Sequence, residues 1–224
     1  MLFHNQALYD ECRALKGGEK VLPPELEELR ARLAKRFNIE ILNLHHELVD
    51  LVGGAERRLR WDIIVGSEED RALLYRSRFE WKEDVKEEIR EEFLQMIASH
   101  RLEERYPTAG IFFSCDVFSE EAINQAVSAF LEKDREALLA VFAADRVWAI
   151  EGYSRKVVVF FEDEEAKRNA GLSGADKRLR GACYYAVKQY DEFDYLNEGD
   201  FLLDLDSKEV LDRHFGGSLF YYFK

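Results

Sequence analysis

The amino-acid sequence predicts an α+β fold with a mixed or mainly antiparallel sheet and flanking amphipathic helices. Some short runs alternate apolar and polar residues, as half-buried strands do. Other runs repeat their apolar residues every three or four positions, as amphipathic helices do. The two kinds of run are interspersed along 224 residues, of which 47% are hydrophobic, and this is enough for a substantial core.

The first part of the chain predicts two helices followed by two strands. Residues 2–15 and 24–37 have helical apolar spacing. Residues 39–52 alternate as a strand, and a helix is a second interpretation of the same stretch. Residues 58–65 alternate strictly, so the apolar face of this strand holds Leu59, Trp61, Ile63 and Val65.

The middle of the chain contains the clearest helix. Apolar residues recur every four positions from Trp81 to Ile97, with charged residues between them. Residues 110–118 predict a buried strand, and two helices follow between 119 and 142. The runs at 146–150 and 157–161 predict two further strands, the second of them rich in β-branched residues.

The last part of the chain mixes charged with aromatic residues. Residues 162–169 predict a charged helix, and the glycine-containing stretch 171–181 predicts a loop. A strand at 201–205 and a helix at 207–215 follow. We expect the aromatic run SLFYYFK to dock into a sheet as a final strand.

One pattern occurs four times, because a strand-like run leads into an acidic helix start at IIVGSEED, DVFSEEA, VVVFFEDEEA and LLDLDSKE. Ser67, Ser119 and Ser207 are the predicted N-caps of the helices that follow three of these runs. We interpret the pattern as helix capping and not as an internal duplication, since the spacing and the flanking residues are not matched closely enough for a repeat array.

The length suits one α+β domain over residues 1–224, and a subdivision near 106 or at 131–135 is the alternative. The chain contains no apolar run of about 18 residues, so we expect no transmembrane helix and no contact with a membrane. The first residues lack the charged and apolar regions of a signal peptide. We therefore expect a soluble protein.

Charge and cysteine content indicate the class of partner and the compartment. The chain has 32 Lys and Arg residues against 45 Asp and Glu residues, for a net charge of −13. This balance disfavours nucleic acid and favours a basic partner. The cysteines Cys12, Cys115 and Cys183 are odd in number and form no C-x-x-C, which indicates a reducing compartment, expected to be the cytoplasm.

Asp62, Glu80 and Lys82 form the one catalytic-looking spacing in the sequence. Metal-dependent nucleases place an acid on one strand and Glu-x-Lys on the next, where the carboxylates hold Mg²⁺ and the lysine helps to activate water. In such a strand Phe79 and Trp81 pack on the face opposite Glu80. The polar residues before Glu80 oppose this interpretation, because that strand is usually buried. We expect Mg²⁺ only under this hypothesis, and otherwise no cofactor and no metal site.

An acidic, aromatic region near the C-terminus is the main candidate for binding a partner. Residues 191–212 hold nine acids and one base, hence a net charge of −8. Aromatic side chains anchor protein partners, and charge steers them together. The alternative is that the aromatic residues are core and the acids are its solvent side. The predicted binding residues are Tyr184, Tyr185, Tyr190, Asp191, Glu192, Asp194 and Tyr195.

A second polar candidate is the predicted loop at 171–181. Its bases Lys177, Arg178 and Arg180 lie among glycines, so they are the predicted contacts for an anion. The stretch lacks the spacing of a phosphate-binding P-loop, and a solvated loop is the alternative.

Three hypotheses of function follow. The missing catalytic set favours a non-enzymatic, cytoplasmic protein-binding or regulatory protein, such as an inhibitor or immunity-type protein whose acidic aromatic face binds a basic partner. The alternative is a Mg²⁺-dependent nuclease or phosphoesterase that uses Asp62, Glu80 and Lys82. The third is a structural homo-oligomer subunit, with the aromatic C-terminal strand at a homodimer edge.

Overall fold

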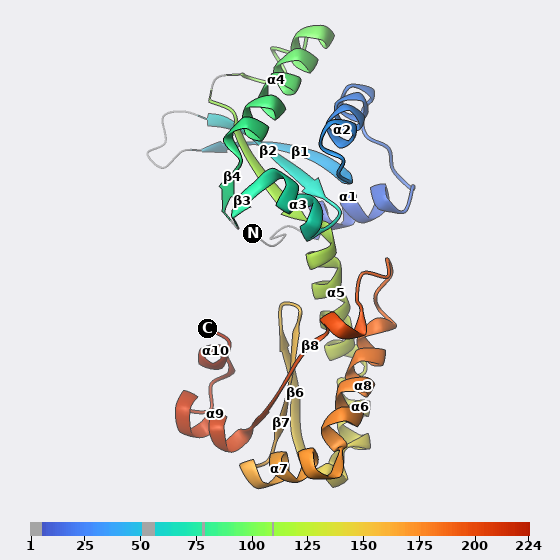
Figure 1. The fold of residues 1–224 in the computed structure, drawn as a ribbon, viewed down its shortest axis with the longest axis vertical. Coiled ribbons are helices and arrows are strands. Elements are labelled where there is room, and N and C mark those ends of the chain that lie inside the picture. The colour runs from blue at the N-terminus through green and yellow to red at the C-terminus, as the bar shows by residue number, and fades with distance from the viewer. Residues whose placement is uncertain (1–5, 51–56, 78, 109) are drawn as a thin grey trace. The chain divides into compact units, whose positions relative to one another are not determined.

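The structure is a computed structural model that describes residues 6–50, 57–77, 79–108 and 110–224 (Figure 1). The chain forms two compact units, Met1–Glu121 (unit 1) and Ala122–Lys224 (unit 2). Their boundary lies between the two places, near 106 and at 131–135, where the sequence allowed a subdivision. Each unit contains a mixed three-stranded sheet flanked by helices, so the predicted α+β class is confirmed.

Unit 1 begins with two helices and a hairpin. The helices are α1 (Gln6–Lys16) and α2 (Pro24–Phe37), and the antiparallel strands are β1 (Ile41–Asp50) and β2 (Arg57–Val65). Of the two interpretations of 39–52, the strand is therefore correct for 41–50. Residues 39 and 40 precede the strand, and residues 51 and 52 lie outside the described part of the chain.

The rest of unit 1 carries the chain from β2 to a third strand. Strand β5 pairs in parallel with β2 and completes the sheet, while β3 and β4 form a separate two-stranded sheet. The bounds of these elements are α3 (Glu68–Leu74), β3 (Tyr75–Ser77), β4 (Glu80–Trp81), α4 (Glu83–His100), β5 (Phe112–Val117) and α5 (Phe118–Lys133), the last of which contains the boundary between the units.

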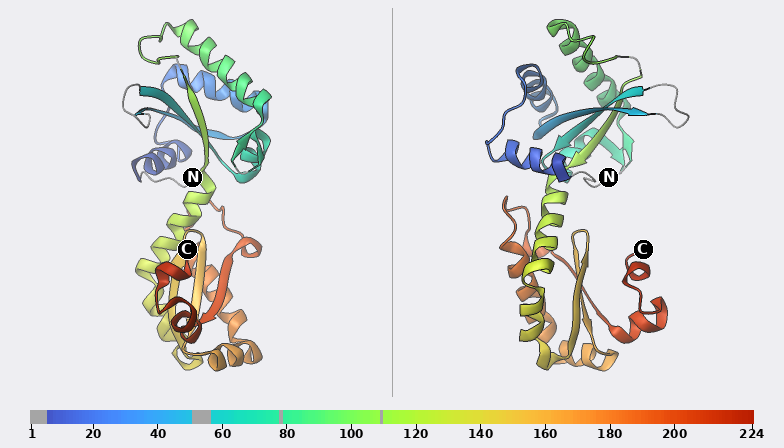
Figure 2. Two further views of the ribbon diagram at one scale, coloured as in Figure 1. Left: turned by 90° about the vertical axis from the view of Figure 1, so that its left-hand side faces the viewer. Right: turned by 180° about the vertical axis from the view of Figure 1, so that it is seen from behind.

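Helices cover both faces of the sheet of unit 1 (Figure 2). The predicted apolar face of β2 packs under α2 and α4, where the Trp61 and Phe93 rings lie 4.2 Å apart between centroids. Helix α1 covers the other face, and the Asn43 amide donates to the buried Cys12 sulfur at 3.6 Å. The predicted strand at 58–65 and the helix with the stripe from Trp81 to Ile97 are therefore confirmed.

Unit 2 has a similar layered arrangement. Its core lies between the sheet and helices that include the C-terminal part of α5 and α8, while α9 and α10 cover the other face. The elements are α6 (Arg135–Val141), β6 (Val147–Tyr153), β7 (Lys156–Phe161), α7 (Glu164–Ser173), α8 (Ala175–Lys188), β8 (Leu202–Ser207), α9 (Lys208–Phe215) and α10 (Leu219–Tyr222), with short 3₁₀ turns at Ala143–Asp145 and Glu198–Asp200.

Two expectations about unit 2 are wrong. The stretch 171–181 is helical, because only Gly174 leaves the helical conformation, with φ +74° at the junction between α7 and α8. Packing dominates over glycine content there, since Ala175, Leu179 and Cys183 recur every four residues on the buried side of α8. The run SLFYYFK forms the short helix α10 and not a strand.

The two units have the same strand topology. In each, an antiparallel hairpin is followed by helices and by a third strand that pairs in parallel with the second, in the orders β1-β2-β5 and β6-β7-β8. Val65 pairs with the first residue of β1 and the last of β5, and Phe161 pairs in the same way with the first residue of β6 and the last of β8. The pairing register shifts after the first residue of β1 and of β6 alike.

The four acidic runs in the sequence occupy equivalent junctions of this repeat. IIVGSEED and VVVFFEDEEA follow β2 and β7, while DVFSEEA and LLDLDSKE follow β5 and β8. Ser67 and Ser207 are N-caps as predicted, because their hydroxyls accept from the amides of Asp70 and Val210 at 3.2 and 3.1 Å. Ser119 lies inside α5, so its predicted capping role is wrong. Capping thus explains part of the pattern, and a structural repeat underlies it.

A bilayer-crossing helix is not found among the described residues, whose helices lack the necessary combination of length and apolar sequence.

Two of the three serines predicted as caps, Ser207 and Ser119, provide a matched test of this difference. The buried Ser207 hydroxyl caps α9 and also donates to Glu164 at 2.6 Å, so Ser207→Ala is expected to lower the free energy of unfolding by about 1–2 kcal/mol. Ser119→Ala removes no cap and is expected to change it by less than about 0.5 kcal/mol. Urea unfolding followed by circular dichroism measures both, and equal losses would contradict the assignment.

Candidate functional site

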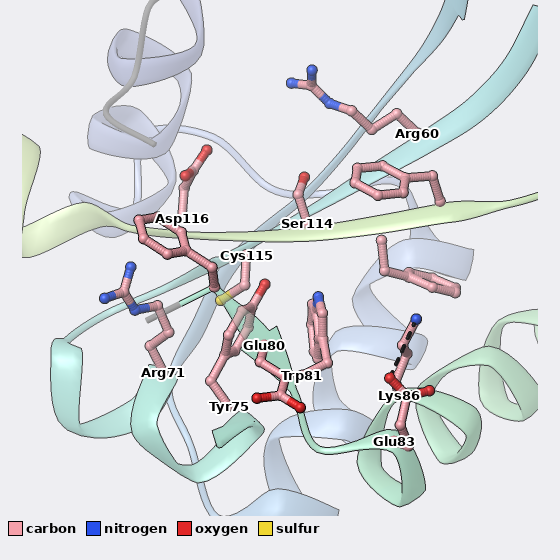
Figure 3. A pocket seen from close by; sticks show the side chains of 13 residues that line it. Arg60, Arg71, Tyr75, Glu80, Trp81, Glu83, Lys86, Ser114, Cys115 and Asp116 are labelled. Carbon is pink, nitrogen blue, oxygen red and sulfur yellow. Dashed lines mark ion pairs between the residues drawn. The ribbon is translucent and has the colours of Figure 1, made fainter. Parts of the chain in front are cut away.

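A cavity of about 400 Å³ lies along β5 in unit 1 (Figure 3). Five consecutive residues, 112–116, line it. Successive side chains of a strand point to opposite faces, so a cavity that touches all five runs along the edge of the strand. Strand β5 is at an edge of its sheet. We call this space the β5-edge cavity.

The β3–β4 pair and the start of α4 form the opposite wall of the β5-edge cavity. The Tyr75 and Trp81 rings lie 4.4 Å apart between centroids, and Trp81 is buried. Phe79 is 84% exposed, so the expectation that it packs beside Trp81 is wrong. Phe112 of β5 is 56% exposed and also lines the cavity. The wall is therefore largely aromatic, with two exposed rings.

An ion pair between the buried Asp62 and the partly exposed Arg60 lies beside the cavity. Asp62 accepts hydrogen bonds from Arg60 Nε at 2.8 Å and Arg60 Nη2 at 2.7 Å, and from the Ser114 hydroxyl. The bond to Asp62 raises the pKa of Arg60. A buried carboxylate needs such partners to offset its lost hydration. The predicted catalytic acid thus binds its own strand neighbour, and the cavity is lined by Arg60 and Ser114 rather than by Asp62 itself.

Asp116 is another carboxyl group in the lining, on the same side of β5 as Ser114 (Figure 3). Burial raises its pKa, and the charge of Asp62 acts in the same direction. The register places Asp116 of β5 and Asp206 of β8 at equivalent positions, facing Ile64 and Phe160. Asp206 accepts from the Tyr222 hydroxyl at 2.9 Å, so one position of the repeat holds an acid in both units.

The three predicted catalytic residues have different environments. Glu80 lines the β5-edge cavity and is exposed, and it lies in the two-stranded sheet, whereas Asp62 lies in the main sheet. Lys82 Nζ donates to the carbonyls of Ala72 and Leu73 at 3.1 and 2.8 Å, at the end of α3. Within the described ranges, no group of three or more His, Cys, Asp or Glu side chains is arranged to hold a metal ion. The Mg²⁺ hypothesis stays a prediction.

In unit 2, Asp191 organises the predicted binding region. Its carboxylate has no exposed surface and accepts from the backbone amides of Tyr195 and Leu196 at 3.1 and 2.7 Å. Lys188 Nζ donates to the same carboxylate at 2.7 Å and to the Leu196 carbonyl at 2.7 Å. These bonds close residues 191–196 into a fixed loop, which we call the acidic loop.

The other predicted binding residues divide into internal and exposed ones. The Tyr190 hydroxyl donates to Asp134 at 2.7 Å, and the Tyr184 ring lies 5.9 Å from the buried Phe201 ring. Tyr195 is half-buried. The exposed members are Tyr185 (64%), Glu192 and Asp194 (side chain 89%).

The three predicted anion contacts lie on α8 and not on a loop. Arg180 donates to the carbonyls of Phe201 and Leu203 at 3.1 and 2.8 Å, so it is bound to the edge of β8. Arg178 lies 3.4 Å from both the Ser173 carbonyl and Asp145, and Lys177 is exposed. The role of these residues in binding an anion stays a prediction.

The three cysteines are free and buried. Burial raises the pKa of Cys12 and of Cys183 to about 12, and it raises the pKa of Cys115 as well. A nucleophilic cysteine needs a lowered pKa, so these side chains behave as small core residues near neutral pH.

The β5-edge cavity is not visible in the sequence, because no local pattern shows that β5 is an edge strand. The alternation in Arg60-Trp61-Asp62 does place Arg60 and Asp62 on one face, and this was the available signal for their ion pair. Comparison of the chain with protein-family models, curated proteins and solved structures gave no significant match. The contacts described above are therefore the basis for any proposal of function.

The Mg²⁺ hypothesis has a direct test at Glu80. It predicts that the wild-type chain binds Mg²⁺ and that Glu80→Ala weakens this binding at least about tenfold, because a carboxylate ligand is lost. Isothermal titration calorimetry measures both affinities. Glu83→Ala is the control, since Glu83 also lines the cavity and is not part of the hypothesis. A wild-type chain that binds no Mg²⁺ would end this hypothesis.

Proposed function

We propose that this chain is a non-enzymatic, cytoplasmic protein-binding protein whose acidic loop in unit 2 captures a basic protein partner. An inhibitor or immunity-type protein that binds a basic toxin needs a negative charge, and this chain has a net charge of −13. The bonds made by Asp191 carry the proposal, because they hold the loop in one conformation while Glu192 and Asp194 stay exposed.

A fixed loop binds more tightly than a flexible one of equal charge, because less conformational entropy is lost when the partner docks. Lys188 neutralises part of the loop, since its Nζ lies 2.7 Å from Asp191 and 2.5 Å from Asp194. The following residues Glu198 and Asp200 are also exposed acids. The loop and its continuation therefore present a negative surface, and the whole chain has a net charge of −13.

Exposed carboxylates and an exposed aromatic ring suit the recognition of a basic protein in different ways. Carboxylates at Glu192 and Asp194 raise the rate of encounter with a positive surface, and salt screens that effect. Tyr185 offers an exposed ring on α8, which can anchor a contact once it has formed. These roles predict separate effects on association and dissociation rates.

Charge reversal of the exposed loop acids tests the proposal. In the double variant Glu192→Lys, Asp194→Lys, association with the partner is expected to slow at least about tenfold at low salt, because steering by charge is reversed. Affinity purification from the native cell with tagged wild-type chain identifies the basic protein retained. Surface plasmon resonance with that protein then measures the association rate at two salt concentrations.

The matched control carries the same change of charge on α4 in unit 1, as Glu87→Lys, Glu91→Lys, where both glutamates are exposed. It is expected to leave association nearly as fast as in the wild-type chain. Retention of no basic protein, or equal slowing by both double variants, would contradict the proposal.

Asp191 is expected to act through the loop and not by contact with the partner. Asp191→Ala removes the acceptor of two backbone amides and is expected to lower the free energy of unfolding by about 2–3 kcal/mol. It is also expected to weaken binding of the partner by raising the dissociation rate. Urea unfolding and surface plasmon resonance measure the two effects, and unchanged hydrogen exchange at Tyr195 and Leu196 would show that the loop does not depend on Asp191.

A further inference from the structure

The repeat allows the edges of β5 and β8 to be compared within one molecule. In unit 2, the Arg180 guanidinium closes the edge of β8 by donating to the carbonyls of Phe201 and Leu203, two residues apart. The backbone groups of alternate residues along a strand point to the same side, so one planar guanidinium can serve both carbonyls. Arg180 thus shows which chemistry completes this edge.

The corresponding carbonyls of unit 1 belong to Ile111 and Phe113. Phe113 faces Trp61 across the parallel pair as Leu203 faces Val157 in unit 2, and both side chains point into the core of their unit. The direction of a residue's carbonyl along the edge follows from the face that its side chain occupies. Phe113 lines the β5-edge cavity, and Ile111 lies directly before β5, one residue from the lining residue Phe112.

The far wall of the cavity is an addition to the shared topology. Between the hairpin and the third strand, unit 2 has α7 and α8 joined at Gly174, whereas unit 1 has the β3–β4 pair between α3 and α4. That pair supplies Tyr75, Phe79 and Trp81 to the cavity. The element that distinguishes unit 1 from unit 2 therefore builds a space over the edge of β5.

The basic side chains of the lining do not exclude a cation, because carboxylates offset their charge. The three basic side chains of the lining are bound to carboxylates, since Arg60 lies 2.7 Å from Asp62, Arg71 lies 2.6 Å from Glu68, and Lys86 lies 3.7 Å from Glu83.

Glu80 and Asp116 add carboxyl groups to the lining, and the Glu80 carboxylate lies 3.8 Å from the exposed Arg76. The exposed rings of Phe79 and Phe112 can contact a guanidinium face. The backbone edge favours an extended chain as the carrier of that guanidinium.

We propose that the β5-edge cavity binds an arginine side chain on an extended segment of another polypeptide. The guanidinium donates to the carbonyl of Phe113 in the cavity and to that of Ile111 at its end, as Arg180 donates to those of Phe201 and Leu203 in unit 2. Phe79 and Phe112 contact the bound segment. This site goes beyond the proposed function, because it lies in unit 1 and depends on none of the contacts of the acidic loop.

The probe is a fluorescently labelled five-residue peptide with arginine at its centre and valine on either side, compared with the same peptide carrying citrulline. Citrulline keeps the shape of arginine and removes its charge. With the full chain, fluorescence anisotropy is expected to give a dissociation constant at least about tenfold lower for the arginine peptide, because its hydrogen bonds are assisted by charge. Equal binding of the two peptides, or no binding of the arginine peptide at about 1 mM protein, overturns the proposal.

Variants locate the binding. The double variant Phe79→Ala, Phe112→Ala is expected to bind the arginine peptide at least about fivefold more weakly, since both exposed rings are lost from the cavity. The matched control is Val141→Ala, Leu172→Ala, two exposed apolar side chains of unit 2, and is expected to bind as the wild-type chain does. Equal affinities of these two double variants overturn the assignment to the cavity.

A further variant separates this site from the acidic loop. Glu192→Lys, Asp194→Lys is expected to leave peptide affinity within about twofold of the wild-type value, because both changes lie in unit 2. A loss of peptide binding in this variant places the peptide on the acidic loop and overturns the proposal. Failure of the loop to capture a basic protein leaves the peptide measurement unaffected.

Discussion

The hydrogen-bonding requirement at the edge of the third strand is the constraint on which the rest of the structure depends. An edge strand leaves alternate backbone groups without a strand partner, and buried polar groups must be satisfied. Unit 2 meets the requirement with Arg180 of α8. Unit 1 places the β3–β4 pair and a cavity there instead. The same topology therefore gives an edge that is bonded to Arg180 in unit 2 and an edge that faces a cavity in unit 1.

The repeat is visible in the sequence only as four acidic runs, and the matching strand topology is visible only in the structure. The four acidic runs are visible because each junction needs an apolar strand end and a helix start, and these requirements constrain few residues. Equivalent positions differ in chemistry elsewhere, as where Asp62 corresponds to Val158 in the register. The β3–β4 pair also changes the spacing between the runs. Helix capping is therefore a sufficient explanation of the four acidic runs at the level of sequence, because spacing and flanking residues are what reveal a repeat there.

Strong periodicity was predictable and irregular structure was not. The strand around Trp61 and the helix with Phe93 follow from patterns that extend over several turns or alternations, and they form one core. The glycines of the stretch 171–181 predict a loop, although the spacing of Leu179 and Cys183 is that of a helix. Glycine lowers helix propensity by about 1 kcal/mol, which burial of a large apolar side chain offsets. The prediction of a strand at the aromatic C-terminus is wrong for a related reason, because aromatic content does not distinguish a strand from a short helix.

The candidate acids show why a charged pattern alone does not locate a site. Asp62 is a predicted catalytic acid under the Mg²⁺ hypothesis and Asp191 a predicted contact for a partner, and the carboxylates of both are buried acceptors. Each has a base at the separation that its secondary structure brings close, namely Arg60 two residues away on a strand and Lys188 three residues away at the end of a helix. A paired, buried acid positions other groups, since its own charge is already used. Glu192 and Asp194 of the same loop are exposed, whereas the conformation of the loop depends on the buried Asp191.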